Sequence, residues 1–423
     1  MHELKRYIER ARIVPRIPDE PARRLGMVVV VPCRQEPDLI ALLDHLQNMK
    51  RPDAHVEVVL VLNHEQGVAE EVARAHRRDA LMVRAWDREY GSEGFRAHVI
   101  EAFDLPPKYA GVGLARKLGM DEAVYRFVRC GQPNGIIASL DADCRVDDDY
   151  LLALPSAFHS HRAHAVVLPY AHDLRQVVDE RHHRAMVFYE LFLRYVELGW
   201  RWAMLPYAFT SIGSCFAVRA DAYARHHGMN RRKAGEDFYF LHKLARERPL
   251  IMLSSPRVYP SSRMSSRTPF GTGQAVRDWY LGGDDAWPVA PPSVFDELRE
   301  LGLHAGELFH MPLRAWLDLR SRPLSIFLLQ AGLESAVDEM RRHAASPETF
   351  RRRFFVWFDG LKAWRYVQHA EQTVPVDIAV AELAARLGWR ECWSDATALL
   401  RMMRAFMLSL ASHRGRACRV RPS

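Results

Sequence analysis

The chain has 423 residues, 48% of them hydrophobic and 26% charged, which is the composition of a globular protein with a large core and excludes a disordered one. This length predicts two or three domains. The net charge is +7, and the cationic residues are spread along the sequence without a long basic run, which argues against nucleic acid as the partner and favours a molecule that carries phosphate.

The cysteines and the apolar runs bear on the cellular compartment. None of the six cysteines forms a C-x-x-C pair, so neither a disulfide framework nor a zinc site is expected. Residues 1–24 are charged throughout, unlike a signal peptide, and no uncharged apolar run reaches the roughly 18 residues of a membrane span. The sequence therefore predicts a cytoplasmic protein.

The first predicted elements form a βαβ unit. The continuous apolar run of residues 27–31 predicts a strand that is buried on both faces. A helix is predicted next from apolar residues at helical spacing: Leu39, Leu42, Leu43, Leu46 and Met49. Residues 56–62 predict a second buried strand, which ends in Asn63. A strand, a helix and a strand in such a short stretch favour a parallel sheet.

The next predicted elements lead to a crevice. Residues 85–113 are rich in Gly, Pro and aromatics, and we expect them to be irregular; helical periodicity returns over 114–128. A third buried strand, 136–140, runs directly into Asp141, and further strands are predicted at 165–169, 214–219 and 250–253. Ligands of open α/β sheets bind beyond the carboxyl ends of the strands. Pro32 to Glu36, Asn63 and Asp141 to Asp143 all lie at such ends, so one nucleotide crevice is expected to hold them.

Residues 184–204 predict a long helix that is crowded with Phe, Tyr and Trp. Aromatic residues at helical spacing usually belong to a core. The alternative is a surface that stacks on sugars or lies at a membrane interface, because Arg194, Trp200, Arg201 and Trp202 occur together.

The amino-acid composition changes over residues 282–292, which are rich in Gly and Pro, and this change indicates a domain boundary. We predict an N-terminal extension (1–25), an α/β domain (26–285) and a helical C-terminal domain (293–423). In the last, Ser346 and Pro347 form a predicted N-cap and first turn. They precede an apolar stripe at helical spacing: Phe350, Phe354, Phe358, Leu361 and Trp364.

Asp141 and Asp143 form a D-x-D motif at the end of a predicted strand. Residues i and i+2 of an extended segment point to the same side, so the two carboxylates converge. Oxygen ligands of this kind suit a hard divalent cation that also binds a diphosphate. The alternative is an Asp-rich turn, since Asp147, Asp148 and Asp149 follow.

Two later motifs have both a functional and a structural interpretation. Glu236 and Asp237 begin a predicted helix, where carboxylates are favoured by the helix dipole, but an Asp near an acceptor hydroxyl would also serve as a general base. The polar loop 261–273 carries Arg263 and Arg267, whose planar forks suit a diphosphate. The alternative for the loop is an ordinary surface segment.

Other chemical signals are weak. His159, His161 and His164 resemble a ligand cluster, but at a helix end the first two face apart. The sequence has no P-loop and no G-x-G-x-x-G after a strand, which argues against NTPases and dinucleotide enzymes.

In their order along the chain, these motifs resemble those of the inverting family 2 glycosyltransferases with the GT-A fold. The first strand of that family ends in Pro-x-x-Asn-Glu, and this chain has Pro32-Cys-Arg-Gln-Glu36. Residues 111–117 correspond to a Gly-x-x-x-Arg segment, and residues 213–219 resemble the strand on the acceptor side. The D-x-D and the Glu236-Asp237 pair are intact. The chain departs from the family at Gln35 and at Asn63, where an acidic residue that touches the base is usual.

The resemblance covers roughly residues 27–273. It implies an α/β fold of GT-A type, with a mixed, mostly parallel sheet and here a helical C-terminal extension. It also implies the inverting, hexosyltransferase-like transfer of a sugar from a nucleotide-diphosphate donor to a hydroxyl acceptor, which could be a glycan, a lipid-linked molecule or a small molecule. Asp143 and Asp141 would hold Mg²⁺ or Mn²⁺, and Asp237, with Glu236 beside it, would be the base. The implied donor contacts are Pro32, Glu36, Asn63, Arg116, Lys117, Asp141, Arg263 and Arg267.

Two other functions compete with this one. A non-catalytic GT-A scaffold would bind a partner or the inner face of a membrane, but it needs none of Asp141, Asp143 and Asp237. A sugar-phosphate nucleotidyltransferase typically has a Gly-rich loop after the first strand, and residues 32–37 contain no Gly. A peripheral membrane contact and a homo-oligomer stay open as partners.

Overall fold

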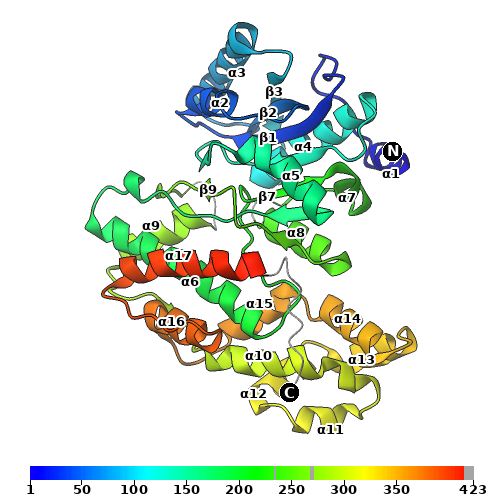
Figure 1. Cartoon of the computed structure of the whole chain (residues 1–423), viewed down its shortest axis with the longest axis vertical. Helices are drawn as coiled ribbons and strands as arrows, with labels where there is room; N and C mark the ends of the chain where they lie inside the picture. Colours follow the sequence, from blue (N-terminus) through cyan, green and yellow to red (C-terminus); the bar gives the residue numbers. More distant parts are fainter. Residues whose placement is uncertain (233–234, 267–270, 414–423) are drawn as a thin grey trace.

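The structure is a computed structural model and describes residues 1–232, 235–266 and 271–413 (Figure 1). In this part of the chain, one sheet has the strand order β3-β2-β1-β4-β7-β6-β8. Its strands are β1 (Leu25–Cys33), β2 (His55–Glu65), β3 (Phe95–Leu105), β4 (Ile136–Ser139), β6 (Ala165–Val167), β7 (Phe216–Arg219) and β8 (Ile251–Met252). Only β7 is antiparallel to its neighbours in this sheet. The mixed, mostly parallel sheet predicted for a GT-A-type α/β fold is therefore confirmed.

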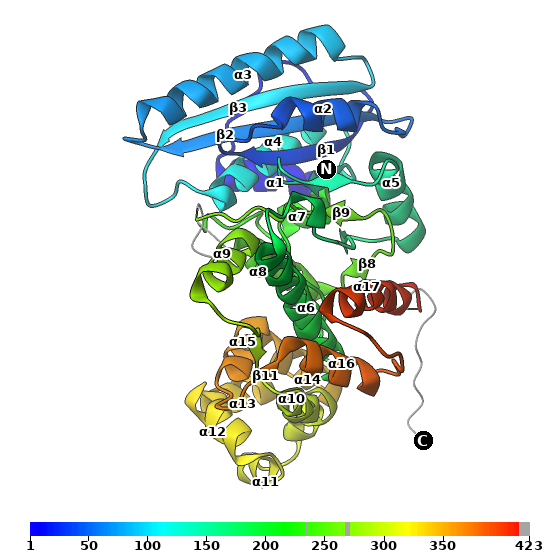
Figure 2. The same cartoon turned by 90° about the vertical axis from the view of Figure 1, so that its left-hand side faces the viewer.

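Helices cover both faces of the sheet, because its strands present apolar side chains to both faces (Figure 2). Val28 and Val30 of β1 pack in the core that contains α1 (His2–Ala11), α4 (Val112–Arg129) and α7 (Ala220–Arg225). Met27, Val29 and Val31 pack in the core on the other face, with α2 (Leu39–Gln47), α3 (Glu70–Tyr90) and α5 (Tyr150–His161).

The remaining elements follow the sheet or connect it to the rest of the chain. Two short antiparallel pairs are formed by β5 (Arg145–Val146) with β9 (Val258–Tyr259) and by β10 (Pro288–Val289) with β11 (Val374–Pro375). The other helices are η1 (Leu174–Gln176), α6 (Glu180–Trp202), α8 (Glu236–Glu247), α9 (Thr272–Gly282), α10 (Ser293–His304), η2 (Ala305–Phe309), α11 (Leu313–Asp318), α12 (Arg322–Gln330), α13 (Leu333–Arg342), α14 (Pro347–Trp357), α15 (Gly360–Gln368), α16 (Val376–Arg386) and α17 (Ala396–His413).

The prediction that residues 85–113 are irregular was wrong. Helix α3 continues to Tyr90, and β3 then forms an edge strand of the sheet that pairs only with β2. Buried Phe95, Ala97 and Ile100 are separated by more polar residues in β3. Phe95 and Ala97 pack on one face of the sheet and Ile100 on the other, so the apolar residues of β3 form no continuous run of the kind that marks a central strand. The search for continuous runs therefore missed it.

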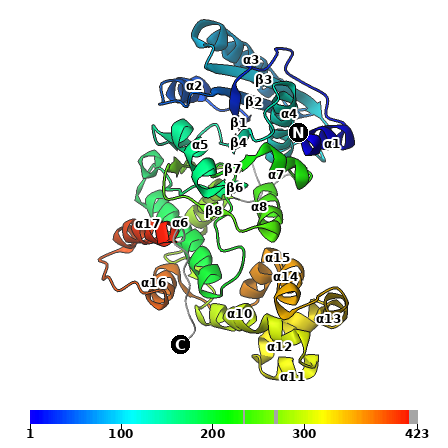
Figure 3. The ribbon, with the colours of Figure 1, turned by 45° about the vertical axis from the view of Figure 1, so that its right-hand side comes forward.

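The long helix α6 lies between the sheet region and the C-terminal helices (Figure 3). Phe188, Tyr189 and Trp200 of α6 are buried, so the core interpretation of this aromatic helix is confirmed for them, and they form no exposed surface for sugars or lipids. The same apolar core continues from α4 through α6 to α16 and α17. The Gly- and Pro-rich residues 282–292 therefore lie where the architecture changes from the sheet to helices, but the apolar core is continuous across this point.

The apolar stripe of residues 350–364 is shared between two helices. Ser346 accepts a hydrogen bond from the Thr349 amide, so the predicted N-cap is confirmed. Helix α14 ends at Trp357, and the Asp359 side chain caps the next helix, α15. Phe350 packs on Phe309, whereas Trp364 packs edge-on against Phe192 of α6 with ring centroids 5.9 Å apart. The C-terminal stripe thus contacts both its own helices and the N-terminal part.

None of the described helices combines the length and the hydropathy that crossing a membrane would require.

Removal of residues 293–423 is expected to cause aggregation. Tyr195 and Trp200 of α6 pack against Phe295 of α10, with centroids 5.3 and 5.5 Å away, and deletion would expose this apolar face. Size-exclusion chromatography with light scattering of residues 1–292 measures the effect. A monomeric, cooperatively folding fragment would contradict the expectation.

Candidate active site

A cleft of about 600 Å³ opens at the carboxyl ends of β1, β2 and β4, and we call it the strand-end cleft. These strands are parallel, so their ends meet at one edge of the sheet, as predicted. Pro32, Glu36, Asn63, Asp141 and Asp143 all line the cleft. The start of α4, the segment before β7, the loop after β9 and the start of α9 complete its walls.

Two carboxylates contact Arg263 on one wall of the cleft. Nη2 of Arg263 is 3.0 Å from Glu36 Oε2 and 3.2 Å from Asp143 Oδ2. Burial, together with the charges of Asp141 and Glu36, raises the pKa of Asp143 to about 6, although Arg263 opposes the shift. A further cation bound beside these carboxylates would favour the charged form of Asp143.

These residues fit a divalent metal. Asp143 is partly exposed to the cleft, its side chain being 33% accessible, and Asp141 is accessible to a similar extent. Within the described residues, no three His, Cys, Asp or Glu side chains converge as a metal site. Mg²⁺ and Mn²⁺ are commonly bound by one or two carboxylates together with phosphate oxygens and water, and Asp141 and Asp143 would fit such a site together with a diphosphate.

Arg116 connects the D-x-D motif to the start of α8. Its Nη2 donates to Asp141 Oδ1 at 2.5 Å, and its Nη1 contacts Glu236 Oε1. The guanidinium lies against Gly213, where a Cβ would come within about 2.5 Å of it. Arg116 and Glu236 are each 2% exposed. The guanidinium and the Glu236 carboxylate satisfy each other, and neither residue is among those that line the cleft, so their predicted roles at the donor and as part of the base stay predictions.

Asp237 is the more accessible carboxylate of the pair at the start of α8. Its Oδ1 accepts a hydrogen bond from the Phe238 amide at 2.7 Å. Asp237 is not itself among the residues that line the cleft. In addition to burial, its charge raises the pKa of two residues that contact or adjoin lining residues, Tyr189 and Cys215. Burial raises the pKa of Tyr189, whose hydroxyl contacts Thr272, and the charge of Asp237 raises this pKa further. Burial also raises the pKa of Cys215, and the charges of Asp141 and Asp237 add to that effect. Burial also raises the pKa of Asp237 itself, which favours a base over a permanent anion.

Lys117 does not lie in the cleft, and its prediction as a donor contact needs correction. Its Nζ lies on the opposite side of α4, 2.9 Å from the Tyr7 hydroxyl and 2.9 Å from Asp121 Oδ2. Tyr223 donates to the same Asp121 carboxylate. The side chain therefore fixes α1 and α7 to α4. Successive helical residues point in different directions, so the position of Lys117 directly after Arg116 in a helix could have indicated that the two side chains do not share a face. Arg267 lies outside the described residues.

The end of β2 supplies residues that the motif search missed. The strand continues past Asn63 to Glu65, which also lines the cleft and pairs with Arg34 at 2.9 Å. Asn63 donates from Nδ2 to the carbonyl of Gly111 at 3.1 Å and so holds the start of α4. Strand periodicity could have identified Glu65, because residues two apart share a face. A carboxylate is thus present near the position where the family's acidic residue stands.

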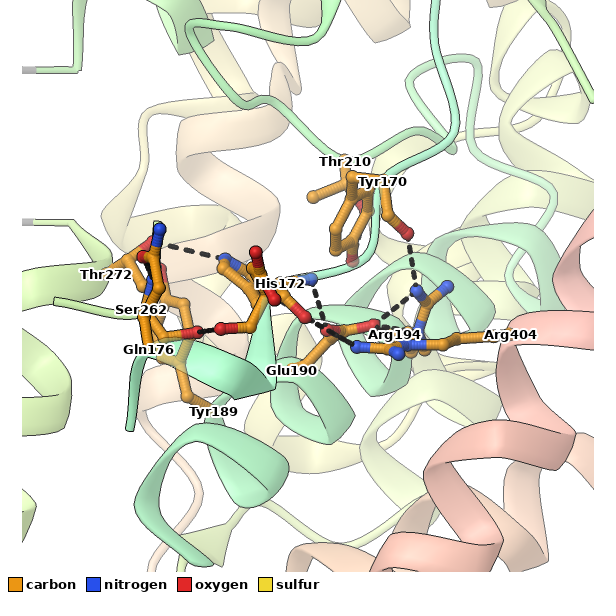
Figure 4. Close-up of polar contacts among 11 residues, drawn as sticks. Tyr170, His172, Gln176, Tyr189, Glu190, Arg194, Thr210, Ser262, Thr272 and Arg404 are labelled. Atoms are coloured by element: carbon orange, nitrogen blue, oxygen red, sulfur yellow. Dashed lines mark hydrogen bonds and ion pairs between the residues drawn. The ribbon is translucent and has the colours of Figure 1, made fainter. Parts of the chain in front are cut away.

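A chain of buried polar contacts joins the cleft to α17 (Figure 4). Thr272 lines the cleft, and its Oγ1 is 3.5 Å from His172 Nε2. Nδ1 of His172 lies 3.1 Å from Glu190, whose two oxygens accept from Arg404 at 2.8 and 2.6 Å. Burial alone would raise the pKa of Glu190, but Arg194, Arg404 and His172 hold it well below its usual value. The last helix of the chain therefore supports the wall of the cleft.

Comparisons with known proteins give only remote likenesses. No protein-family model and no curated sequence matches the chain. Among solved structures, TarS residues 1–349 from S. aureus in complex with UDP-GlcNAc is 13% identical with a TM-score of 0.40, over 78% of this chain and 91% of that one. The mannosyltransferase PcManGT from Pyrobaculum calidifontis, in complex with GDP-Man and Mn²⁺, is 16% identical with a TM-score of 0.37, over 88% and 95%.

Proposed function

We propose that the protein is a metal-dependent, inverting glycosyltransferase that uses a nucleotide-diphosphate sugar. The observation that carries the proposal is the strand-end cleft, in which Asp141 and Asp143 lie with Glu36 and Arg263 at the ends of parallel strands. The diphosphate of a sugar nucleotide is negatively charged. In such a site, Arg263 would pair with it and a divalent cation would neutralise it.

The chain's own residues have separate tasks in this reaction. Asp141 and Asp143 would hold the cation, which stabilises the negative charge on the departing diphosphate. Arg263 would exchange its carboxylate partners for phosphate oxygens. The acceptor oxygen attacks the anomeric carbon opposite the diphosphate, the bond from that carbon to the phosphate oxygen breaks, and Asp237 takes the acceptor proton.

A thermal-shift screen of nucleoside diphosphates with Mn²⁺ or Mg²⁺ tests the donor site. A ligand at 100 times its Kd adds about 2.7 kcal/mol to the free energy of unfolding, which is readily measured. At least one nucleoside diphosphate is expected to stabilise the protein only when the metal is present. If none does, and no donor sugar is turned over, the proposal is wrong.

Asp143→Ala is expected to abolish metal-dependent donor binding without unfolding the protein, because it removes a partly exposed ligand and relieves repulsion from Asp141 and Glu36. Isothermal calorimetry of the nucleoside diphosphate with Mn²⁺ measures the effect. Asp148→Ala is the matched control, since Asp148 is an exposed carboxylate in the following turn and should bind donor normally. Unchanged affinity in Asp143→Ala would remove Asp143 from the site.

A further inference from the structure

A second cavity, of about 550 Å³, lies beside α8, and we call it the α8 cavity. Residues 230–232 form one wall, the outer face of α8 forms the floor, and the start of α15 forms the opposite wall. None of its residues lines the strand-end cleft. It is therefore a separate site that the donor does not occupy.

The lining of the α8 cavity is strongly basic. Arg231, Arg232, Lys243 and Arg246 all line it, and Asp359 is the one carboxylate among its lining residues. That carboxylate already has partners, because it accepts from Arg246 Nη2 and from the backbone amide of Lys362 in the first turn of α15, each at 3.1 Å. In the described part of the chain, no carboxylate forms an ion pair with Arg231, Arg232 or Lys243 within 4 Å.

Lys243 has the environment of a cation that lacks an anion. Its Nζ donates to the Gly228 carbonyl at 2.8 Å. Burial, followed by repulsion from Lys117 and Arg246, lowers the pKa of Lys243 to about 8. An anion bound in the cavity would reverse that repulsion, since an opposite charge nearby favours the charged form of a lysine.

Aromatic side chains provide the rest of the floor. The guanidinium of Arg232 lies over the Tyr239 ring at 3.7 Å from the centroid, and Phe238 stacks on His242 with centroids 4.0 Å apart. Rings of this kind offer apolar faces for the C–H surface of a sugar or polyol, while the surrounding cations bind its charged groups.

The α8 cavity adjoins the candidate base. Phe238 and Tyr239, in its lining, directly follow Asp237 in the first turns of α8. On the other side, the Arg116 contacts with Glu236 and Asp141 connect the same helix start to the strand-end cleft. Asp237 itself lines neither cavity, so the α8 cavity is reached from the strand-end cleft only across the start of α8.

We propose that the α8 cavity is a binding site, separate from the donor cleft, for an anionic polyhydroxy compound whose phosphate or carboxylate groups are held by Arg231, Arg232 and Lys243. This inference goes beyond the proposed function, because the cavity shares no residue with the strand-end cleft. A neutral ligand would leave these cations without a counterion, whereas an anionic one would form charge-assisted hydrogen bonds to them.

Direct binding to the full-length protein tests the inference without requiring turnover. Glucose 6-phosphate, glucuronate and glucose are titrated separately at low salt and followed by calorimetry or NMR. At least one of the two acids is expected to bind ten-fold or more tightly than glucose, and the tighter acid identifies the preferred group. The double variant Arg231→Gln/Lys243→Gln should abolish the preference, because it removes two cations from the cavity.

The matched control is Arg352→Gln/Arg353→Gln, which removes two exposed cations from α14, and it should bind like the parent. Binding of a nucleoside diphosphate with Mn²⁺ is measured in the same variants and should not change. If neither acid is preferred over glucose, or if the preference survives in Arg231→Gln/Lys243→Gln, the inference is wrong even where donor binding is intact. If donor binding is absent in the parent, the proposed function itself fails.

Discussion

Asp237→Asn is expected to lower turnover by about 10²–10⁴-fold while leaving donor affinity unchanged. The substitution removes the carboxylate that would take the acceptor proton. It keeps an oxygen that can accept the hydrogen bond from the Phe238 amide. The free energy of unfolding should therefore change by no more than about 1 kcal/mol. Steady-state kinetics with a saturating donor, combined with denaturant unfolding, separates the two effects.

Helix α16 provides a matched control for this experiment. Asp377 is the second residue of α16, as Asp237 is of α8, and it lines neither cavity. Asp377→Asn should change neither turnover nor stability appreciably. Transfer by Asp237→Asn at close to the parent rate would remove Asp237 as the base. A loss of stability that accounts for the loss of activity would assign it a structural role.

Arg116→Met is expected to destabilise the protein by about 3–5 kcal/mol, the range observed when one partner of a buried ion pair is removed. The substitution leaves Glu236 buried without its cation and releases Asp141 in the cleft. Arg116→Met/Glu236→Gln should recover part of the loss, because the second substitution removes the unpaired charge. Urea unfolding of both single variants and the double variant measures the coupling.

The loss in Arg116→Met should also depend on pH. Burial, together with the charges of Asp237 and Asp141, already raises the pKa of Glu236 despite Arg116. Without Arg116, this pKa rises further, so Glu236 binds a proton in the folded state at a pH where the unfolded chain has released it. The destabilisation should therefore be largest above the folded-state pKa of Glu236 and should shrink as the pH falls through it. A loss that is the same at every pH would show that Glu236 is not left unpaired.

The sequence by itself determined the central strands and the place of the D-x-D carboxylates at a strand end. The apolar runs of β1, β2 and β4 are local signals, because a strand buried on both faces needs apolar residues at every position. Parallel pairing then brings Pro32, Asn63 and Asp141 to one edge, as predicted. The N-cap of α14 was also predictable, since capping depends on a few neighbouring residues. The start of α8 was predictable from the two acidic residues of its first turn, which the helix dipole favours.

Only the tertiary structure decided which charged groups face a ligand. Arg116 and Glu236 are 120 residues apart, and Lys117 meets Tyr7 of the N-terminal helix. A charged residue has the same spacing in the sequence whether its partner is a substrate or a distant carboxylate. Burial then fixes the choice, because an ion removed from water must be paired. For the same reason the α8 cavity was not predictable, since its cations come from a loop and a helix that only folding brings against the start of α15.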